Sequence, residues 1–514
     1  MAIKTFAAID VGSYELSMKI YEVSKSKGMK EIDHIRRGID MGTESYTTGK
    51  LSYQRVEELC QILREYAGIM KAYQVSDYVA YGTSAVREIA NTGILLDQIE
   101  QRTGIRIEVL SNSEQRFLDY KSVAFQGEEF RKILEKPTVI VDIGGGSIQV
   151  SLFENDTLVS TQNMKMGVLR LRERLTHLDA SVRHYEELLT EIIDSQLVVY
   201  KKLYLKESRI NNIIVVDDYI STLLLKKGNE GAGKGYGKKQ LLEKFLADYQ
   251  SRNLYELARE WDMPEENMQI LYISLIMLKR IMETMGAELL WAPGVTLCDG
   301  IAYEYAEQNR MIKEAHDFEK DIIACAHNIS KRYRGSKRRS ETLEQIALTI
   351  FDSMKKVHGL GKRERMLLQL STILHDCGKY ISMANLAQCS YSIIMSTEMI
   401  GLSHAEREIV ANVVKYNHLE FEYYEEMSRY SMMDRESYLK IAKLTAILKL
   451  ANGLDRSHKQ KFKNVKTALK DDQLIITVDT NEDITLERGL FGARAAFFGE
   501  VYSIRPVIRQ KRTI

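Results

Sequence analysis

Two short turns in this sequence carry acidic, glycine and hydroxyl residues in the same order. Each turn follows an apolar run and leads into an alternating run, a pattern typical of two antiparallel strands joined by a tight turn. Glycine and serine let backbone N–H groups approach a phosphate closely, and an aspartate at a strand end can hold a hydrated divalent cation or a water beside it. The pattern predicts a phosphate clamp with Asp10 and Asp142 as metal ligands and, as phosphate-binding residues, Gly12, Ser13, Gly144, Gly145, Gly146 and Ser147.

The elements expected around the two turns repeat along the chain. They are a hairpin at 6–21, a helix at 51–71 and strands at 77–81 and 106–110, then a hairpin at 138–153, a strand at 158–162, a helix after Gly167 and a strand at 212–216. This duplication predicts two α/β lobes with a cleft that faces the turns. We assign residues 1–126 to the first lobe and 127–306 to the second.

The remainder of the chain changes character twice. The pattern is nearly all helical from about residue 317 to 455 and alternates again near the end, so we expect a helical domain at 312–462 and a small α+β domain at 463–514. Thr342 and Gln345 fit a capping box that opens a helix over 343–356. A basic run precedes this helix and is either a solvated linker face or a channel for a polyanion: Lys331, Arg332, Arg334, Lys337, Arg338 and Arg339.

Composition bounds the class of protein. The chain has 514 residues and a formal net charge of +1, so several domains are expected, with no global electrostatic attraction to nucleic acid. No stretch is apolar enough for a membrane span, and the N-terminus lacks the pattern of a signal peptide. The five cysteines form no CxxC pair, which favours reduced thiols. We expect a cytoplasmic protein that binds no membrane and no specific nucleic acid.

The motifs resemble those of the Ppx/GppA family, the exopolyphosphatases and guanosine pentaphosphate phosphohydrolases. The resemblance spans essentially the whole chain and implies an α/β fold of two actin-like (ASKHA, ribonuclease H-like) lobes followed by an all-α HD-type domain. It also implies release of terminal phosphate with Mg²⁺, and a homodimer through the helical domain. The motifs, in order, are Asp10-x-Gly12-Ser13, Gly82-Thr83-Ser84-Ala85-Val86-Arg87-Glu88-x-Ala90-Asn91, Asp142-Ile143-Gly144-Gly145-Gly146-Ser147 and Met166-Gly167-Val168-Leu169-Arg170-Leu171.

The second of these motifs supplies three more candidate phosphate contacts. Thr83, Ser84 and Arg87 follow the strand at 77–81. A guanidinium in this position suits contact with phosphate oxygens. The alternative for Arg87 is an ordinary residue on a helix surface.

The carboxylate that activates water in the family corresponds to Glu114 or Gln115. The family has a Glu-Glu-Ala-Arg segment here, and this chain has Ser113-Glu114-Gln115-Arg116-Phe117. An ungapped alignment puts Gln115 at the second Glu, and a one-residue slip puts Glu114 there. Glutamine can orient a water but cannot accept its proton. Glu114 is alternatively a carboxylate that stabilises a helix N-terminus.

Two further positions of the cleft depart from the family pattern. Gln149 stands where the family usually has Glu, and this change is expected to weaken Mg²⁺ binding. Asp217-Asp218 replaces a Gly-Gly-Thr cradle. Two carboxylates there would repel polyphosphate unless a metal ion intervened.

The helical domain carries the pair His375-Asp376 without the companions of a working HD metal centre. Such a centre needs an upstream His and a distal Asp, where this chain has Arg339 or Ser340 and Asn452. Cys389-Ser390 stands at the His-Ser position of the family, while His418 and Asp455 are retained nearby. We interpret the domain as structural or regulatory.

These observations lead to a phosphohydrolase acting on inorganic polyphosphate or guanosine pentaphosphate. Glu114, with Gln115, would position the attacking water, and Mg²⁺ would neutralise the developing charge. The alternative is a catalytically weakened regulatory protein that binds polyphosphate or a guanosine polyphosphate. An actin-like ATPase or kinase is a third interpretation, but the second lobe lacks a recognisable adenosine-binding glycine pair.

Overall fold

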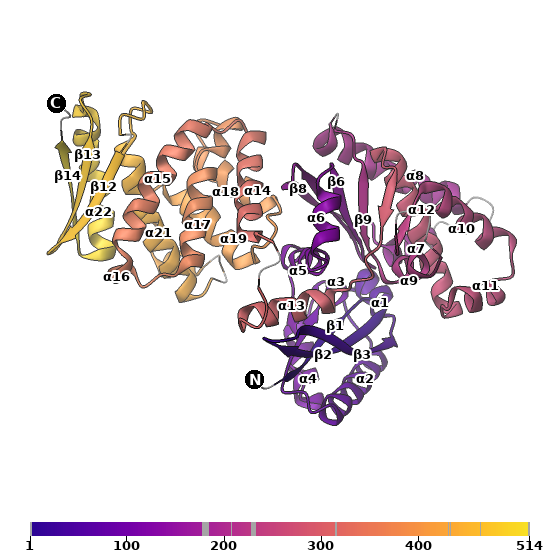
Figure 1. Ribbon diagram of the computed structural model, residues 1–514. Helices are drawn as coiled ribbons and strands as arrows, with labels where there is room; N and C mark the ends of the chain where they lie inside the picture. The colour runs from indigo at the N-terminus through magenta and orange to yellow at the C-terminus, as the bar shows by residue number, and fades with distance from the viewer. Residues whose placement is uncertain are drawn as a thin grey trace. The chain divides into compact units, whose positions relative to one another are not determined.

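The computed structural model describes residues 3–176, 185–206, 208–227, 233–313, 316–429, 431, 433–462 and 464–511. It divides into two compact units, Met1–Phe318 and Glu319–Ile514, whose elements are labelled in Figure 1. The division falls where the sequence pattern becomes nearly all helical. Within the described ranges, every helix is too short or too polar to cross a membrane.

The first lobe of unit Met1–Phe318 is built on a five-stranded sheet. Its elements are β1 (Lys4–Val11), β2 (Glu15–Ser24), β3 (Gly28–Gly38), α1 (Met41–Thr48), α2 (Tyr53–Ala72), β4 (Asp77–Gly82), α3 (Ser84–Arg87), α4 (Thr92–Thr103) and β5 (Glu108–Val109). The strand order is β3-β2-β1-β4-β5, with β1 antiparallel to β2 and parallel to β4.

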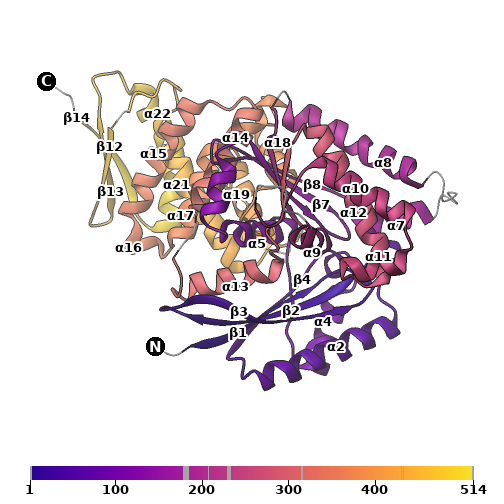
Figure 2. The same ribbon diagram turned by 45° about the vertical axis from the view of Figure 1, so that its right-hand side comes forward.

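The two faces of this sheet bind different helices. Successive side chains of a strand point to opposite faces, so Ala7 and Ile9 of β1 pack with α2 and α4. Phe6 and Ala8 pack instead with α13 (Leu297–Gln308). Figure 2 shows α2 and α13 on opposite sides of the sheet.

The second lobe repeats this plan with additional helices. Its elements are β6 (Thr138–Ile143), β7 (Ile148–Glu154), β8 (Thr157–Met164), α7 (Val168–Thr176), α8 (Tyr185–Tyr200), η2 (Lys201–Leu205), β9 (Asn212–Val216), α9 (Asp218–Lys227), β10 (Tyr236–Gly237), α10 (Lys239–Ser251), α11 (Leu254–Trp261), η3 (Glu265–Asn267), α12 (Met268–Met285) and β11 (Leu289–Trp291). The strand order is β10-β11-β9-β6-β7-β8, and β6 is antiparallel to β7 and parallel to β9. The duplicated α/β lobes expected from the sequence are confirmed.

Helix α5 (Asn112–Ala124) lies between the two sheets (Figure 1). Leu118 belongs to the apolar cluster of β1 and α13, whereas the Tyr120 ring lies 5.1 Å from the Phe153 ring of β7. A shorter helix, α6 (Glu128–Leu134), follows and accepts a hydrogen bond from Thr138 of β6 at the carbonyl of Ile133. Because both lobes pack on α5, most of its residues are buried.

Helix α13 packs with the first lobe, although the sequence analysis assigns residues up to 306 to the second. The Tyr305 ring stacks on Phe6 of β1 at 3.9 Å between centroids. Cys298 and Ile301 are buried in the same cluster. The apolar face of a helix predicts that it packs, but the pattern does not identify the sheet that it packs against.

Unit Glu319–Ile514 is a helical bundle with a small sheet. Its elements are α14 (Phe318–Arg332), α15 (Lys337–Ser353), α16 (Lys355–His358), α17 (Lys362–Leu374), η4 (Cys377–Tyr380), α18 (Leu386–Ser396), α19 (His404–Tyr416), α20 (Tyr424–Met427), α21 (Arg435–Leu454), β12 (Asn464–Lys470), β13 (Gln473–Asp479), α22 (Thr485–Tyr502) and β14 (Arg505–Lys511). β13 pairs antiparallel with β12 and parallel with β14. The C-terminal α+β part packs on α15 and α21 and forms one compact unit with the bundle.

The helix expected at 343–356 begins earlier, so this prediction is wrong. α15 starts at Lys337, and Ser336 is its N-cap, accepting a hydrogen bond from Arg339 N. The Thr342 hydroxyl donates to Arg338 O inside the helix. The basic run therefore extends into the first turn of α15.

Replacing Gly300 of α13 with alanine should displace α5. A Cβ atom at this position would lie 2.1 Å from the backbone oxygen of Leu118, which cannot rotate away. We expect a loss of about 3 kcal/mol in the free energy of unfolding, the upper range for overpacking, measured by denaturant melts. The control is Gly68→Ala on α2, where a Cβ meets nothing within 4 Å and a gain of ~0.5 kcal/mol is expected. Equal stability of the two variants would contradict the close approach of α13 and α5.

Candidate functional site

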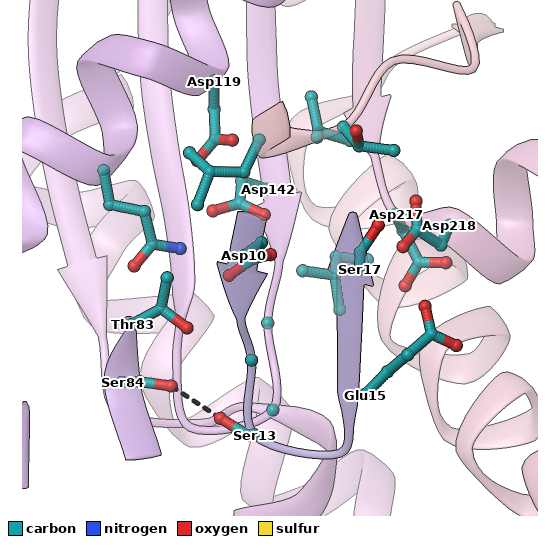
Figure 3. A pocket seen from close by; sticks show the side chains of 18 of the residues that line it. Asp10, Ser13, Glu15, Ser17, Thr83, Ser84, Asp119, Asp142, Asp217 and Asp218 are labelled. Carbon is teal, nitrogen blue, oxygen red and sulfur yellow. Dashed lines mark hydrogen bonds between the residues drawn. The ribbon is translucent and has the colours of Figure 1, made fainter. Parts of the chain in front are cut away.

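One pocket of unit Met1–Phe318 gathers residues from both glycine turns, from α5 and from both lobes. Its volume is about 100 Å³, which accommodates a phosphoryl group with a few waters, since each water takes ~30 Å³. Neither lysine nor arginine is among the described residues that line it. The acidic lining residues are Asp10, Glu15, Asp119, Asp142, Asp217 and Asp218, all labelled in Figure 3.

Strand alternation directs the two predicted metal ligands toward α5. Asp10 is on the same face of β1 as Phe6 and Ala8, the face that packs with α13 and α5. Asp142 is on the same face of β6 as Thr138, whose hydroxyl donates to α6. The two aspartates therefore come from equivalent positions of the duplicated lobes.

The two glycine turns meet at one end of the pocket. The Ser13 hydroxyl lies 2.6 Å from the Tyr46 hydroxyl and 2.9 Å from the Ser84 hydroxyl, and these last two are 2.7 Å apart. A Cβ at Gly145 would lie 2.9 Å from Ser13 Cβ, and one at Gly146 would lie 2.5 Å from the Tyr46 hydroxyl. Glycine is required at these two positions because the opposite lobe approaches so closely.

Arg170 links the second turn to the first lobe. Its Nε donates to Gly146 O at 3.0 Å, and its Nη2 donates to both carboxylate oxygens of Glu88 in the first lobe, at 2.8 and 2.7 Å. The guanidinium also lies 4.4 Å from the centroid of the Tyr46 ring. Charge-assisted hydrogen bonds to both oxygens of one carboxylate, with an aromatic face beside the guanidinium, fix its orientation as well as its distance.

Burial and mutual repulsion raise the pKa values of the pocket acids. Burial, followed by the charges of Asp218 and Glu15, raises the pKa of Asp10 well above its ordinary value. Burial also raises the pKa of Glu15, Asp142 and Asp217 to about 7. Desolvation disfavours a charged carboxylate and a neighbouring negative charge disfavours it further, so the site favours protons or cations.

Asp119 and Asp142 form a carboxyl pair. Their side chains are hydrogen-bonded to each other, which requires one shared proton. Burial and the charge of Asp142 raise the pKa of Asp119 well above its ordinary value. Asp119 Oδ2, Asp142 Oδ2 and Asp10 Oδ1 have no hydrogen-bond partner among the described residues.

These unpartnered oxygens fit a hard divalent cation. Mg²⁺ keeps several waters and binds through one or two carboxylates and substrate phosphates. In the part of the chain that the structure describes, no three His, Cys, Asp or Glu side chains are close enough to hold a metal ion by themselves. Two of the unpartnered oxygens, those of Asp10 and Asp142, come from equivalent strand ends of the two lobes.

The sequence-predicted residues divide between the pocket and its surroundings. Those that line it are Asp10, Gly12, Ser13, Thr83, Ser84, Gln115, Asp142, Gly144 and Gly145. Gly146 and Ser147 complete the second turn behind the lining. Arg87 donates from Nη1 to the carbonyl of Leu110, at the base of α5, and does not line the pocket.

Glu114 lies outside the pocket, and Gln115 lies in its wall. The Glu114 carboxylate accepts hydrogen bonds from the backbone N–H and the hydroxyl of Ser111, at 3.0 and 2.6 Å, in the capping box of α5. Gln115 Oε1 is buried and has no hydrogen-bond partner among the described residues. The geometry thus matches the ungapped alignment of the segment and the helix N-terminal role of Glu114.

Gln149 lies beside the pocket, where its side chain is hydrogen-bonded to Arg116. Its Oε1 accepts from Arg116 Nε at 2.9 Å, and Arg116 Nη1 also donates to Thr161. Arg116 is only 2% exposed. Its charge lowers the pKa of Asp119 and of Asp142, partly offsetting their burial.

Asp217 and Asp218 both line the pocket but differ in their partners. Asp217 caps α9, accepting from Ile220 N at 2.7 Å and from the Ser274 hydroxyl at 3.1 Å. Asp218 lies 3.6 Å from Arg36, which lies equally far from Glu15. Both carboxylate oxygens of Asp217 therefore have hydrogen-bond partners, whereas Asp218 reaches the pocket with an ion pair to Arg36.

Sequence reasoning missed Asp119 and Glu15 as pocket residues. Asp119 follows Gln115 by four positions, the spacing that puts two helical residues on one face. That signal was present in the sequence, but the face of α5 that borders the pocket could not be identified. Glu15 follows the first turn and could have been found from its position at the start of β2.

In unit Glu319–Ile514, the HD-like positions come together around a guanidinium. Arg339 Nη2 donates to Asn452 Oδ1 at 2.8 Å, and Arg339 Nε lies 3.5 Å from Asp455 Oδ2. Arg339 is 4% exposed. Burial lowers the pKa of His375 to about 3 and of His418 to about 4, so both imidazoles are neutral near pH 7.

The contacts of His375 and His418 complete this cluster. His375 Nδ1 donates to the carbonyl of Thr372 at 2.8 Å, and His418 Nε2 donates to the carbonyl of His375 at 3.0 Å. Asp376 lies 3.6 Å from Lys379. The cluster is thus a buried ion-paired network, and the other five residues of the basic run are exposed.

Comparison with known proteins gives matches along most of the chain. Residues 19–308 match the model of the Ppx/GppA phosphatase family, and residues 323–492 match that of Ppx/GppA phosphatase, domain III. The chain is 21% identical over 494 residues to a guanosine-5'-triphosphate,3'-diphosphate pyrophosphatase of Vibrio atlanticus (strain LGP32), covering 94% of this chain and 92% of that protein. It is 24% identical over 190 residues to Exopolyphosphatase 1 of Mycobacterium leprae (strain TN), covering 37% and 55%.

A solved structure shares the fold of the first unit. An exopolyphosphatase from Cytophaga hutchinsonii ATCC 33406 matches with a TM-score of 0.52 at 17% identity, covering 59% of this chain and 98% of that chain. The duplicated lobes are therefore of the actin-like α/β type expected from the sequence.

The Asp142→Asn variant should gain stability over the wild type as pH rises. The folded-state pKa of Asp142 is about 7, against an ordinary value of 3.8. Between these values the folded protein retains a proton that the unfolded chain releases, so stability falls as pH rises and the loss is complete above pH 7. Asparagine does not titrate, so its advantage should grow by on the order of 1 kcal/mol per pH unit between pH 4 and 7.

Denaturant melts in EDTA from pH 4 to 8 measure this difference. Excess Mg²⁺ should stabilise the wild type above pH 7 and leave the Asp142→Asn variant unchanged. Asp97→Asn, at an exposed carboxylate of α4, is the matched control and should show no pH-dependent difference. A flat difference for Asp142→Asn would contradict the buried, repelled state of this carboxyl.

Removing the Arg339 guanidinium should lower the free energy of unfolding of the helical unit. Arg339→Ala leaves Asp455 buried without the cation of its ion pair, which typically costs ~3–5 kcal/mol. Arg338→Ala, one residue away and exposed, should change stability by no more than ~0.5 kcal/mol. Denaturant melts of both variants test this, and similar stability of the two would show that Arg339 does not hold the cluster together.

Proposed function

Because the chain belongs to the Ppx/GppA phosphatase family, we propose that it releases terminal orthophosphate from inorganic polyphosphate or guanosine pentaphosphate. The observation that carries the proposal is the meeting of two glycine turns at one acidic pocket, with Gly145 and Ser13 in close contact. Such a pocket accepts the end of a phosphate chain rather than its middle, because the turns close one side. The relatives named as a guanosine-5'-triphosphate,3'-diphosphate pyrophosphatase and an exopolyphosphatase support these two substrates.

We propose Mg²⁺ as the cofactor, held by Asp10 and Asp142. Six acids in one pocket would repel a polyanion. In a buried site this repulsion is stronger than the hydrogen bonds that the pocket could form with the phosphate oxygens. The bound cation would neutralise this charge and the charge that develops on the phosphoryl oxygens. The unpartnered oxygens of Asp10 and Asp142 support this assignment.

The remaining pocket residues would orient the substrate and the water. The hydroxyls of Ser13, Thr83 and Ser84 can donate to phosphoryl oxygens once they exchange their present partners. Gln115 can accept a hydrogen bond from the attacking water through Oε1, which is buried and unpartnered among the described residues. Hydrolysis by positioning and electrostatics of this kind suits phosphoryl transfer, where the protein forms no covalent bond.

A second candidate function rests on Gln115 itself. An amide orients a water but does not accept its proton, so a protein with this side chain in the wall of the pocket could bind its ligand without cleaving it. The alternative is a regulatory protein that binds polyphosphate or a guanosine polyphosphate in the same pocket. Catalysis distinguishes the two functions.

We further propose that the protein acts in the cytoplasm as a homodimer. The five cysteines are all free thiols, Cys389 being the one that is not fully buried. Free thiols persist in a compartment that keeps them reduced. The homodimer is an expectation from the family resemblance and can be measured by light scattering.

The proposed reaction is tested by orthophosphate release from long-chain polyphosphate and from guanosine pentaphosphate. We expect release with Mg²⁺ and none in EDTA. Asp10→Asn should lower the rate ~100-fold or more, a typical effect of removing one electrostatic contact to a phosphoryl transition state. Asp97→Asn, the exposed control on α4, should retain the wild-type rate. Binding of either compound without any release would instead support the regulatory function.

A further inference from the structure

We propose that a second pocket of unit Met1–Phe318 binds small molecules that carry three linked phosphate groups. This lysine pocket lies where α8, η2 and α12 pack together, and Figures 1 and 2 show α8 and α12 side by side. Its volume is about 370 Å³, within the range of small-molecule sites, ~300–1,000 Å³. Its lining includes Lys201, Lys202, Lys206 and Arg280, and no described residue lines both this pocket and the acidic one.

A π turn brings the three lysines to one pocket. The last buried residue of α8 is Tyr200, and the next buried residue is Leu205, five positions on, where the spacing of an α-helix would be three or four. The turn η2 accommodates the extra residue, because Lys206 N donates to Lys201 O at 2.8 Å across five positions. Lys206 therefore lies one turn beyond Lys201, and both line the pocket together with Lys202.

The charge of these lysines is not balanced by the acid that shares their pocket. All three are exposed and have no ion pair among the described residues. The acid is Asp194, and Arg280 already binds it, donating from Nε and Nη2 to its two carboxylate oxygens at 2.9 and 2.7 Å. The described lining thus holds four cations against one carboxylate. Like charges that converge repel one another, and an anionic ligand relieves this repulsion.

The type and number of the cations indicate the class of ligand. An ammonium group has three donors that rotate freely, and lysine binds phosphate as a point charge. Three such groups around one space suit a ligand with several linked phosphates, and the Thr284 hydroxyl of the lining can donate to a further oxygen. Val198 adds an apolar side to the pocket and is 64% exposed. An inorganic triphosphate and a nucleoside triphosphate share this chemistry.

The two pockets should bind such a ligand under opposite conditions. The acidic pocket has no lysine or arginine in its described lining, so it requires a bound cation before it can accept a polyanion. The lysine pocket supplies its own cations. The pockets are separate places on one helix, because Ser274 of α12 donates to Asp217 of the acidic pocket, whereas Arg280 lies further along α12. In EDTA, only the lysine pocket should bind a triphosphate.

Calorimetric titration with inorganic tripolyphosphate in EDTA tests the proposal. The wild type should bind it, with an affinity that falls as salt is added. The double variant Lys201→Gln with Lys206→Gln should lower the affinity at least ~10-fold, a typical loss for hydrogen bonds to charged groups. The matched control, Lys238→Gln with Lys244→Gln, removes two exposed lysines at α10 that lie outside the lining, and it should keep the wild-type affinity. Melting temperatures of all three proteins should agree, since the substituted side chains are exposed.

Two further ligands define the class. Guanosine triphosphate should bind if the pocket accepts nucleotides, and binding of tripolyphosphate alone assigns it to inorganic chains. Citrate carries three carboxylates and less charge, so it should bind at least ~10-fold more weakly. Absence of tripolyphosphate binding, an unchanged affinity in the Lys201 and Lys206 double variant, or equal affinity for citrate overturns the proposal. The titration does not involve orthophosphate release, so its result is independent of the proposed function.

Discussion

Mutual repulsion among buried carboxyl groups is the constraint on which this structure depends. The pocket of the first unit is lined by six acids and, among its described residues, by no lysine or arginine. Burial raises the pKa of Asp142 and Asp217 to about 7 and that of Asp10 well above its ordinary value. Because these acids repel one another, other contacts must hold the two lobes together. The apolar packing of α5 and α13 and the Arg170–Glu88 pair provide those contacts. They place no positive charge in the described lining of the pocket.

Helix α5 converts the duplicated lobes into one site. Each lobe contributes a strand-end aspartate from an equivalent position, and α5 lies where both faces point. Because it packs on both sheets, it can present Gln115 and Asp119 to residues of either lobe. The close contact of Gly300 with the backbone of Leu118 sets the depth at which α5 lies. The geometry of the pocket thus depends on a backbone contact between α5 and α13.

Sequence patterns predicted what depends on neighbours along the chain and missed what depends on packing. Asp10 and Asp142 were predicted because continuous apolar runs end at them and alternating runs follow the turns. Glu114 was assigned two roles, and the spacing Ser111-x-x-Glu114 already favoured the capping box that the structure contains. Asp119 was missed because α5 is buried on nearly all sides, so its sequence has no polar stripe to mark the face toward the pocket. Ser336 was missed as the N-cap of α15 because a second capping pattern, Thr342 with Gln345, follows it within the helix.

The two units neutralise buried carboxylates in different ways. In the second unit, the guanidinium of Arg339 lies 3.5 Å from Asp455, and Asn452 accepts its hydrogen bond. A divalent cation at this place would have to displace the guanidinium of Arg339. His375 is neutral and donates from Nδ1 to a carbonyl, so it has one nitrogen left for a metal ion. In the first unit the acids have no built-in cation among the described residues apart from Arg36 and Arg116 at the periphery.

A permanent side-chain cation gives a stable core that does not depend on solution conditions. A pocket without one keeps its charge available for an exchangeable cation, and an exchangeable cation is what a polyanionic ligand can share. Arg339 therefore takes the place of a cation among the acids of the second unit, whereas the acids of the first-unit pocket have no such side chain in their described lining.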